Sequence, residues 1–134
     1  MPQSYNSVIL HVIFSTKYRE SLIDDTLEQK LYAQIIEQLE KQKCIPIIIN
    51  GMPDHIHILY YQNLQNSISD TIKQLKGASS FWVNNIYKSS FHFQWQRGYG
   101  VFSVSKLNLD TVYNYIKWQK RHHKTKQTSR GYAQ

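Results

Sequence analysis

The chain has 134 residues, 41% of them hydrophobic, which suits one domain (residues 1–134) with its own core. No apolar run approaches the roughly 18 residues of a membrane span, and the N-terminus does not begin as a signal peptide. The single cysteine, Cys44, excludes an internal disulfide, and the net charge of +7 favours an acidic partner, so we expect a cytoplasmic protein.

The first half of the chain predicts a strand, a helix and two more strands. Residues 7–14 are apolar at every second position, as in a strand with one buried face. Residues 25–28 resemble a capping box, and the helix that they open has an apolar stripe. Residues 44–50 form a β-branched run whose Pro46 favours an edge position or a bulge. Residues 51–54 then turn the chain into a strand that carries two histidines.

The second half predicts a helix, a strand and a last helix. Residues 67–70 cap the first helix, whose inward side chains are Ile68, Ile72, Leu75, Ser79, Trp82 or Val83, and Ile86. Residues 94–104 form the last strand, and Asn108 is the expected N-cap of a helix striped by Leu109, Val112 and Ile116. This order predicts an α+β fold, a ferredoxin-like βαββαβ sandwich with an added C-terminal helix that carries a tyrosine.

His55 and His57 alternate with Ile56 and Ile58, so both imidazoles leave the same face of their strand. We expect the isoleucines to face the helix-covered core and the histidines to face the other side. Two adjacent neutral imidazoles can begin a metal site. Taken alone, however, the pattern more often marks two ordinary half-exposed histidines.

Tyr115 and Gln119 are four residues apart and therefore share one face of the last helix, beside its apolar stripe. Taken alone, they fit a tyrosine at the rim of a core and a glutamine in solvent. If the helix closes over the histidines, two imidazoles and an amide oxygen can hold a divalent cation, and the Tyr115 hydroxyl can attack a phosphodiester. Tyr113 is the competing nucleophile, but it faces nearly the opposite side of the helix.

Five segments, in this order and spacing, carry a family pattern: residues 11–19, 53–57, 75–80, 95–105 and 115–119. The pattern resembles the single-tyrosine HUH transposases, which comprise the TnpA group of insertion sequences and the REP-associated tyrosine transposases. The resemblance implies that His55 and His57 are the HUH metal ligands, Gln119 the third ligand and Tyr115 the nucleophile.

The same resemblance implies an Mg²⁺ or Mn²⁺ cofactor and a single-stranded DNA hairpin as substrate. It implies that the strand is cut and rejoined through a 5′-phosphotyrosine bond without ATP. It also implies a homodimer, in which the tyrosine helix can serve the metal site of its own subunit or of the partner.

Phosphate neutralisation would explain the uneven placement of the basic residues. The candidate DNA-binding residues are Lys17, Arg19, Lys73, Lys76, Arg97, Tyr99, Lys120 and Arg121. Tyr99 is included because aromatic rings stack on single-stranded bases. After His122-His123, relatives often continue into an acidic, apolar stretch, whereas residues 124–134 are polar and basic here. This segment is either a flexible basic tail or a shortened terminus.

Two other classes of protein remain as alternatives. Residues 97–104 nearly match the RNP1 signature of an RRM, in which aromatic rings on a sheet stack on RNA bases. Against an RRM, this segment would be the fourth strand rather than the third, and Val104 replaces the final aromatic residue. A zinc hydrolase would use His55, His57 and a third ligand such as His11 or Cys44, and its activity would not depend on Tyr115.

Overall fold

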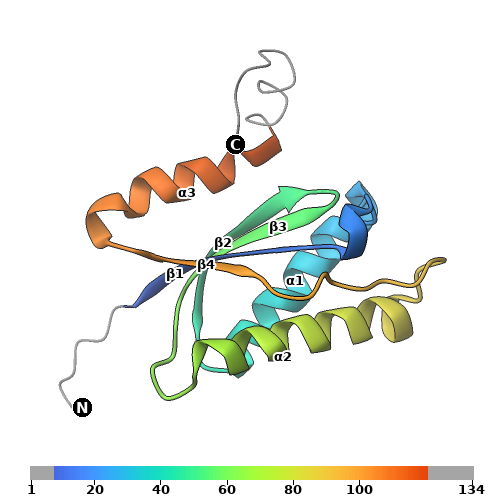
Figure 1. Cartoon of the computed structure of the whole chain (residues 1–134), viewed down its shortest axis with the longest axis horizontal. Coiled ribbons are helices and arrows are strands. Elements are labelled where there is room, and N and C mark those ends of the chain that lie inside the picture. The colour runs from blue at the N-terminus through green and yellow to red at the C-terminus, as the bar shows by residue number, and fades with distance from the viewer. Residues whose placement is uncertain (1–7, 121–134) are drawn as a thin grey trace.

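The computed structural model describes residues 8–120. Its elements in chain order are β1 (Ile9–Ser15), a 3₁₀ turn (Lys17–Arg19), α1 (Asp25–Lys41), β2 (Ile45–Met52), β3 (His55–Tyr61), α2 (Ile68–Phe81), a π-helical turn (Trp82–Tyr87), β4 (Gly100–Val104), a second 3₁₀ turn (Lys106–Asn108) and α3 (Leu109–Lys117). The strands form one antiparallel sheet in the order β2-β3-β1-β4. Helices α1 and α2 cover one face, and α3 lies on the other (Figure 1). This arrangement confirms the predicted α+β, ferredoxin-like fold with an added C-terminal helix.

The main core lies between the sheet and the helices α1 and α2. Strand alternation turns every second residue of β1 and β3 toward it, and the apolar stripes of α1 and α2 meet them. The predicted inward residues of these elements are buried there: Leu10, Val12 and Phe14 of β1, Ile56 and Ile58 of β3, Leu27, Leu31, Ile35 and Leu39 of α1, and Ile72 and Leu75 of α2. Tyr60 of β3, which was not predicted to face the core, is buried with them. Within residues 8–120, no helix is both long and apolar enough to cross a bilayer.

Helix starts agree with the sequence patterns to within one residue. Asp24, rather than Asp25, caps α1, and its carboxylate accepts a hydrogen bond from the Leu27 amide at 2.8 Å. Ser67 caps α2 as predicted, accepting from the Asp70 amide at 3.0 Å. Asn108 precedes α3, but its side chain makes no capping bond.

Two predictions about the second half were wrong. The last strand begins at Gly100 rather than at residue 94, and only Trp95 of the preceding segment pairs with a strand residue, through one bridge to Thr16. Ile86 is exposed instead of buried, because the π-helical turn after α2 changes the angular position of the residues that follow it.

β2 is an edge strand, and its register against β3 shifts between Pro46 and Ile48. Both features predicted for Pro46, the edge position and the irregularity, are therefore present. At its other end, β2 joins β3 through a turn at residues 53 and 54. Gly51 sits so close to β3 that a Cβ atom at this position would collide with the His55 carbonyl oxygen and lie 2.7 Å from the Ile56 Cα.

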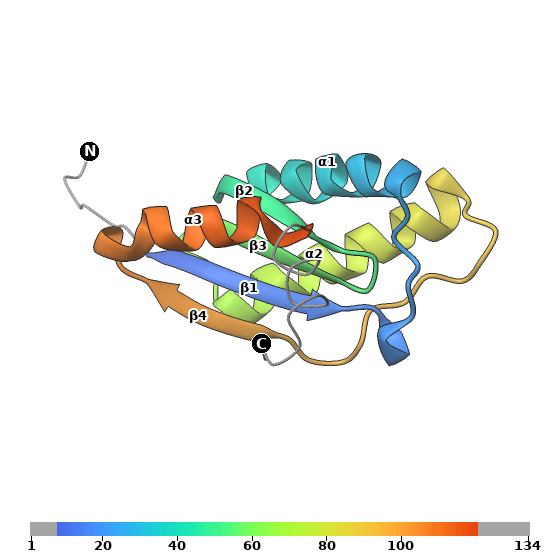
Figure 2. The same cartoon turned by 90° about the horizontal axis from the view of Figure 1, so that it is seen from above.

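Helix α3 rests on the second face of the sheet through a small apolar cluster. Ile116 packs there against Ile9 of β1 and Leu59 of β3. The Asn50 side chain of β2 donates hydrogen bonds to the carbonyls of Ile116 and Lys117, at 3.0 and 3.1 Å. Viewed from above, α3 leaves β4 uncovered to one side (Figure 2).

Candidate functional site

His55 and His57 project from β3 on the face that α3 covers, while Ile56 and Ile58 enter the main core. This confirms the predicted division of the strand. The two rings lie 5.1 Å apart between centroids, with planes at 74°. Their residues are only 6% and 4% exposed, so the interpretation as two half-exposed histidines is wrong.

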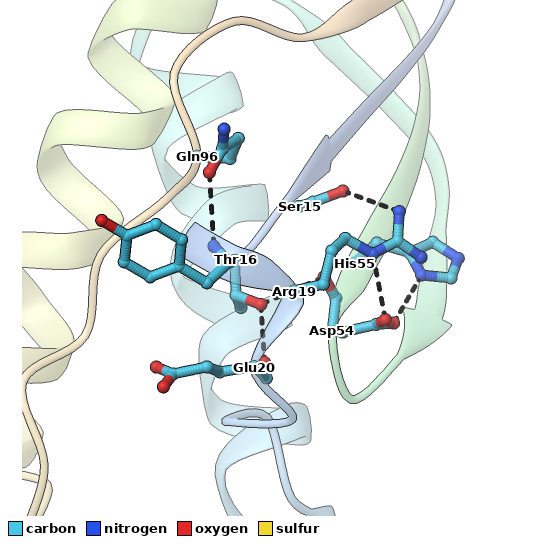
Figure 3. A network of polar contacts seen from close by, with 8 residues as sticks. Ser15, Thr16, Arg19, Glu20, Asp54, His55 and Gln96 are labelled. Atoms are coloured by element: carbon cyan, nitrogen blue, oxygen red, sulfur yellow. Dashed lines mark hydrogen bonds and ion pairs between the residues drawn. The ribbon is translucent and has the colours of Figure 1, made fainter.

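His55 is held by an acid in the turn that precedes it. Its Nδ1 donates to Asp54 Oδ1 at 2.8 Å, and the other carboxylate oxygen, Oδ2, accepts from Arg19 Nε at 3.1 Å (Figure 3). Burial favours a higher pKa for Asp54, but the hydrogen bond from His55 and the charge of Arg19 outweigh it and hold the pKa below its usual value. The carboxylate is therefore charged and fixes the orientation of the His55 ring.

His57 is held by a histidine from another strand. His11 of β1 brings its Nε2 to 2.8 Å from the Nδ1 of His57, and the two rings stack at 5.1 Å with planes 29° apart. Burial lowers the pKa of His11, which favours a neutral ring able to accept the His57 proton. An imidazole that donates from Nδ1 has its lone pair on Nε2, as metal-binding histidines commonly do.

Tyr115 of α3 lies against the candidate ligands. Its ring is 5.7 Å from the His57 ring between centroids, with planes at 85°, and the side chain is half-buried. Within residues 8–120, it is the Tyr115 ring and not the Tyr113 ring that contacts His57. The structure thus brings the predicted nucleophile and the predicted histidines together within one chain.

Gln119 follows the end of α3 at Trp118 and is fully buried. Its Nε2 donates to the Tyr115 carbonyl at 3.4 Å, while its Oε1 has no hydrogen-bond partner among the residues that the structure describes. A buried amide oxygen without a partner is costly, typically by about 1–3 kcal/mol. Two imidazoles oriented through Nδ1 and an oxygen of this kind are a donor set that fits a divalent cation.

Within residues 8–120, the zinc-hydrolase alternative finds no third ligand. In the described part of the chain, no three His, Cys, Asp or Glu side chains gather as a metal site. Cys44 is buried in the main core, on the opposite side of the sheet from the two histidines. His11 is engaged with His57 Nδ1 instead of standing beside it as a separate ligand.

Five of the eight candidate DNA-binding residues line two neighbouring cavities beside α2 and the segment before β4. Lys17, Lys76 and Arg97 line one, of about 510 Å³, and Lys73, Lys76 and Tyr99 line the other, of about 420 Å³. Lys76 also has a structural role, because its ammonium donates to the carbonyls of Gln96 and Gly98 at 2.7 and 2.8 Å. Burial lowers the pKa of this lysine.

The other three candidates lie elsewhere. Arg19 binds Asp54, as described above. Lys120 contacts Glu28 at 2.8 Å and the Asn50 Oδ1 and Gly51 carbonyl at 3.0 Å, so it joins the end of α3 to α1 and β2. Arg121 and His122-His123 lie outside the described residues.

The residues that orient the two imidazoles were not predicted from the sequence. Asp54 could have been identified, because a turn acid directly before a candidate ligand is within reach of its ring. His11 could not be assigned this position, because its register against β3 cannot be read from either strand alone. Asn50, which holds the end of α3, had no signal in the sequence pattern.

Comparisons with known proteins identify the sequence family and the fold. Residues 4–119 match the sequence family described as IS200-like transposase. The ISDra2 transposase TnpA of Deinococcus radiodurans is 27% identical, in an alignment that covers 81% of either chain. A crystal structure from Deinococcus radiodurans R1, described as a transposase, has a TM-score of 0.69 at 26% identity and covers 89% of this chain and 95% of that one. A REP-associated tyrosine transposase bound to a REP hairpin has a TM-score of 0.68 at 14% identity, covers 92% of this chain and 72% of that one, and shows likeness of fold alone.

Proposed function

The chain belongs to the family of IS200-like transposases, and we propose that it cuts and rejoins single-stranded DNA through a covalent bond between Tyr115 and a 5′ phosphate. The contact between the Tyr115 and His57 rings, which lie far apart in the sequence, carries this proposal. It brings a phenol to the imidazoles that would hold the scissile phosphate through a metal ion.

His55, His57 and Gln119 would hold the metal, which we propose to be Mg²⁺ or Mn²⁺. The buried Gln119 oxygen, which has no hydrogen-bond partner within residues 8–120, and the Nδ1 contacts of both histidines support this set. When bound, the ion would supply Lewis-acid polarisation of the phosphate oxygens. Asp54 and His11 would keep the two rings in the orientation that the ligand set needs.

In the proposed step, the Tyr115 oxygen forms a bond to phosphorus, and the bond between phosphorus and the 3′ oxygen breaks. The phenol gives up its proton, and the departing strand end gains one to become a 3′ hydroxyl. The phosphotyrosine bond keeps the energy of the broken phosphodiester, so a 3′ hydroxyl can reverse the reaction and rejoin the strand without ATP. The step as a whole is nucleophilic catalysis, with Tyr115 forming the covalent intermediate.

We propose a DNA hairpin as the bound substrate and a homodimer as the assembly. A REP hairpin bound to a protein of similar fold supports the hairpin. The basic side chains around the cavities beside α2 would neutralise its phosphates, and we expect the affinity to fall steeply with salt. The short distance between Tyr115 and His57 in one chain favours a self-contained active site over one completed by the partner.

Replacement of Tyr115 by phenylalanine tests the nucleophile. The full-length protein is incubated with Mg²⁺ or Mn²⁺ and hairpin oligonucleotides copied from palindromes in the DNA that flanks the gene. Tyr115→Phe should abolish the covalent protein–DNA adduct seen on a denaturing gel, because it removes only the attacking oxygen. Hairpin affinity should stay within about twofold, as for other substitutions that leave packing intact.

Tyr113→Phe is the matched control, since it removes the same atom two residues away on the same helix. This variant should form the adduct normally, and chelation by EDTA should stop adduct formation by the wild type. An adduct that persists in Tyr115→Phe and disappears in Tyr113→Phe would assign the reaction to Tyr113 instead.

A further inference from the structure

Phe102 of β4 is a large aromatic side chain that the fold leaves open, with 56% of the residue exposed. It pairs with His11 in the sheet register, so its ring stands on the same face as the candidate metal ligands. The rings of Phe102 and His11 lie 6.0 Å apart between centroids, and His11 contacts His57 in turn. Strands in a sheet are about 4.8 Å apart, and Phe102 and His57 pair with β1 residues that are two positions apart. The two backbones are therefore roughly 12 Å from each other across β1.

A pocket of about 320 Å³ lies beside this ring. Ile13 and Gly100, which are paired in neighbouring strands, line it together with Phe102. Because Gly100 has no side chain, the edge of the phenyl ring lies over its backbone: a Cβ atom there would be 3.5 Å from the ring, an ordinary contact. The pocket is therefore bounded by the Ile13 side chain, the bare Gly100 backbone and the phenyl ring of Phe102.

The charge around this pocket is complementary to a polyanion. Arg97 lines it and also lines the neighbouring cavity, where Lys17 and Lys76 are found. No aspartate or glutamate is among the described residues that line either cavity. A ligand with an apolar ring and adjoining negative charges matches this combination.

The segment that carries Phe102 is the one that resembles an RNP1 motif. In that motif, aromatic rings on an open sheet face stack on unpaired bases. The segment lies on the outermost strand here, and α3 does not cover this strand (Figure 2). The central aromatic residue of the motif corresponds to Val101 here, one position before Phe102, so the resemblance does not by itself make Phe102 a stacking residue. The exposed ring on an uncovered strand supports that role instead.

We propose that the pocket beside Phe102 binds one unpaired base of single-stranded DNA, stacked on the phenyl ring and adjacent to the phosphate that Tyr115 attacks. The position next to the attacked phosphate rests on the proposed function; the binding itself does not. Arg97 then contacts the backbone that leaves the pocket toward Lys17. Stacking accepts any base, so this site fixes the position of the strand more than its sequence.

The test measures binding without cleavage. The full-length protein in EDTA is titrated into a fluorescein-labelled ten-residue oligothymidylate, and the affinity is read from fluorescence anisotropy. Phe102→Ala should weaken binding by roughly 5- to 150-fold, the usual effect of removing one stacking partner. Phe102→Trp should restore the affinity, because it returns an aromatic face of at least the same area.

Phe81→Ala is the matched control, because Phe81 is an equally exposed phenylalanine (60%) at the end of α2. It should change the affinity by no more than about twofold. Gly100→Val provides a second route that keeps Phe102, since the added methyl groups fill the pocket; it should weaken binding as Phe102→Ala does. If Phe102→Ala fails to fold by circular dichroism, Gly100→Val decides the question.

Three results would overturn the proposal. The first is unchanged affinity in the variants of Phe102 and Gly100. The second is a shift in oligomeric state that places the ring at a contact between two copies. The third is tighter Phe102-dependent binding of oligouridylate than of oligothymidylate. The adduct assay is independent of these outcomes. If Phe102 does not affect binding but Tyr115 still forms the adduct, only the proposed base-binding site is disproved. If binding depends on Phe102 but no adduct forms, the base-binding site stands and the proposed cleavage reaction is disproved.

Discussion

The Nδ1 atom of each candidate ligand is hydrogen-bonded to another side chain of the protein, but the two side chains differ in charge. His55 has a charged carboxylate, Asp54, which a neighbouring arginine stabilises. His57 has a neutral histidine, His11, whose pKa is lowered by burial. An acceptor that fixes the tautomer of a ligand typically changes metal affinity by about 10- to 100-fold when it is lost.

His11→Phe should therefore weaken Mn²⁺ binding by about 10- to 100-fold, measured by isothermal titration calorimetry on the DNA-free protein. The phenylalanine keeps a flat ring in the same place but leaves the His57 Nδ1 proton without its acceptor. His11→Gln offers an amide oxygen near the same position and should retain most of the affinity. The exposed His92 is the control, and His92→Ala should bind Mn²⁺ as the wild type does. Equal affinity in His11→Phe and His11→Gln would show that the contact is only packing.

Sequence alone predicted the faces of His55 and His57, because alternation along a strand depends only on position. It could not predict the contact between His11 and His57. The two strands are far apart along the chain, and a register shift of one residue would have turned His11 to the other face of the sheet. The burial of Gln119 was equally hidden, since it depends on where the end of α3 meets the sheet.

Two glycines show how differently the same residue acts within a strand and within a helix. Gly51 lies where β2 approaches β3 beside His55, and a side chain there would meet backbone atoms that cannot rotate away. Gly77 lies within α2, and a Cβ at this position would meet nothing within 4 Å. The first glycine is required by the hairpin, while the second only adds flexibility to the unfolded chain and to the helix.

The substitutions Gly51→Ala and Gly77→Ala should change the free energy of unfolding in opposite directions. Gly51→Ala should lower the free energy of unfolding by about 1–3 kcal/mol, as overpacking usually does. Gly77→Ala should raise it by about 1 kcal/mol, because alanine is the better helix former. Urea titration followed by circular dichroism measures both values. A stable Gly51→Ala would mean that β2 moves away from β3 at little cost.

The segment before β4 shows why a strand pattern in the sequence was not enough. Residues 94–99 were predicted to belong to the last strand. In the structure, the Lys76 ammonium binds the carbonyls of Gln96 and Gly98, and the Gly98 backbone has a φ of +84°. Trp95 turns into the core, where it packs edge-on against Phe14 and Phe93. Contacts with α2 therefore replace strand pairing, and a prediction made from local pattern cannot include them.

The molecule has two apolar layers of unequal size. The larger layer joins the sheet to α1 and α2, while the smaller one, centred on Ile9, Leu59 and Ile116, attaches α3. The hydrogen bonds from Asn50 to the last carbonyls of α3 add to this smaller layer. The position of Tyr115 over the histidines thus depends on the weaker of the two attachments.

Asn50→Ala should loosen α3 without unfolding the domain. The substitution removes the two hydrogen bonds to the α3 carbonyls and the one that Asn50 Oδ1 accepts from Lys120. The two bonds to α3 correspond to about 1–3 kcal/mol, so amide exchange in residues 109–117 should become roughly 5- to 150-fold faster. Exchange in β1 and β3 should stay close to wild type, as followed by hydrogen–deuterium exchange and mass spectrometry. Asn85→Ala, which removes a carboxamide bonded to the Phe81 carbonyl, is the control and should leave α3 unchanged. A global loss of protection in Asn50→Ala would show that the two layers unfold together.

The order of strands and the layer that buries each helix could be anticipated from the sequence, because apolar periodicity and the short connections leave few alternatives. For α3, the sequence predicted only that its apolar stripe would pack against another element. Its position along the sheet is set by Asn50 and Lys120, whose polar contacts leave no periodic trace.

The partners of the two imidazoles also differ in how far along the chain they come from. Asp54 neighbours His55 in the turn between β2 and β3, so that ring can be oriented as soon as the hairpin closes, within microseconds for an isolated hairpin. His11 reaches His57 only after β1 has docked between β3 and β4, which requires long loops to close first. A folding chain would thus acquire the His55 half of the site early and the His57 half late, and tight metal binding would report completion of the sheet.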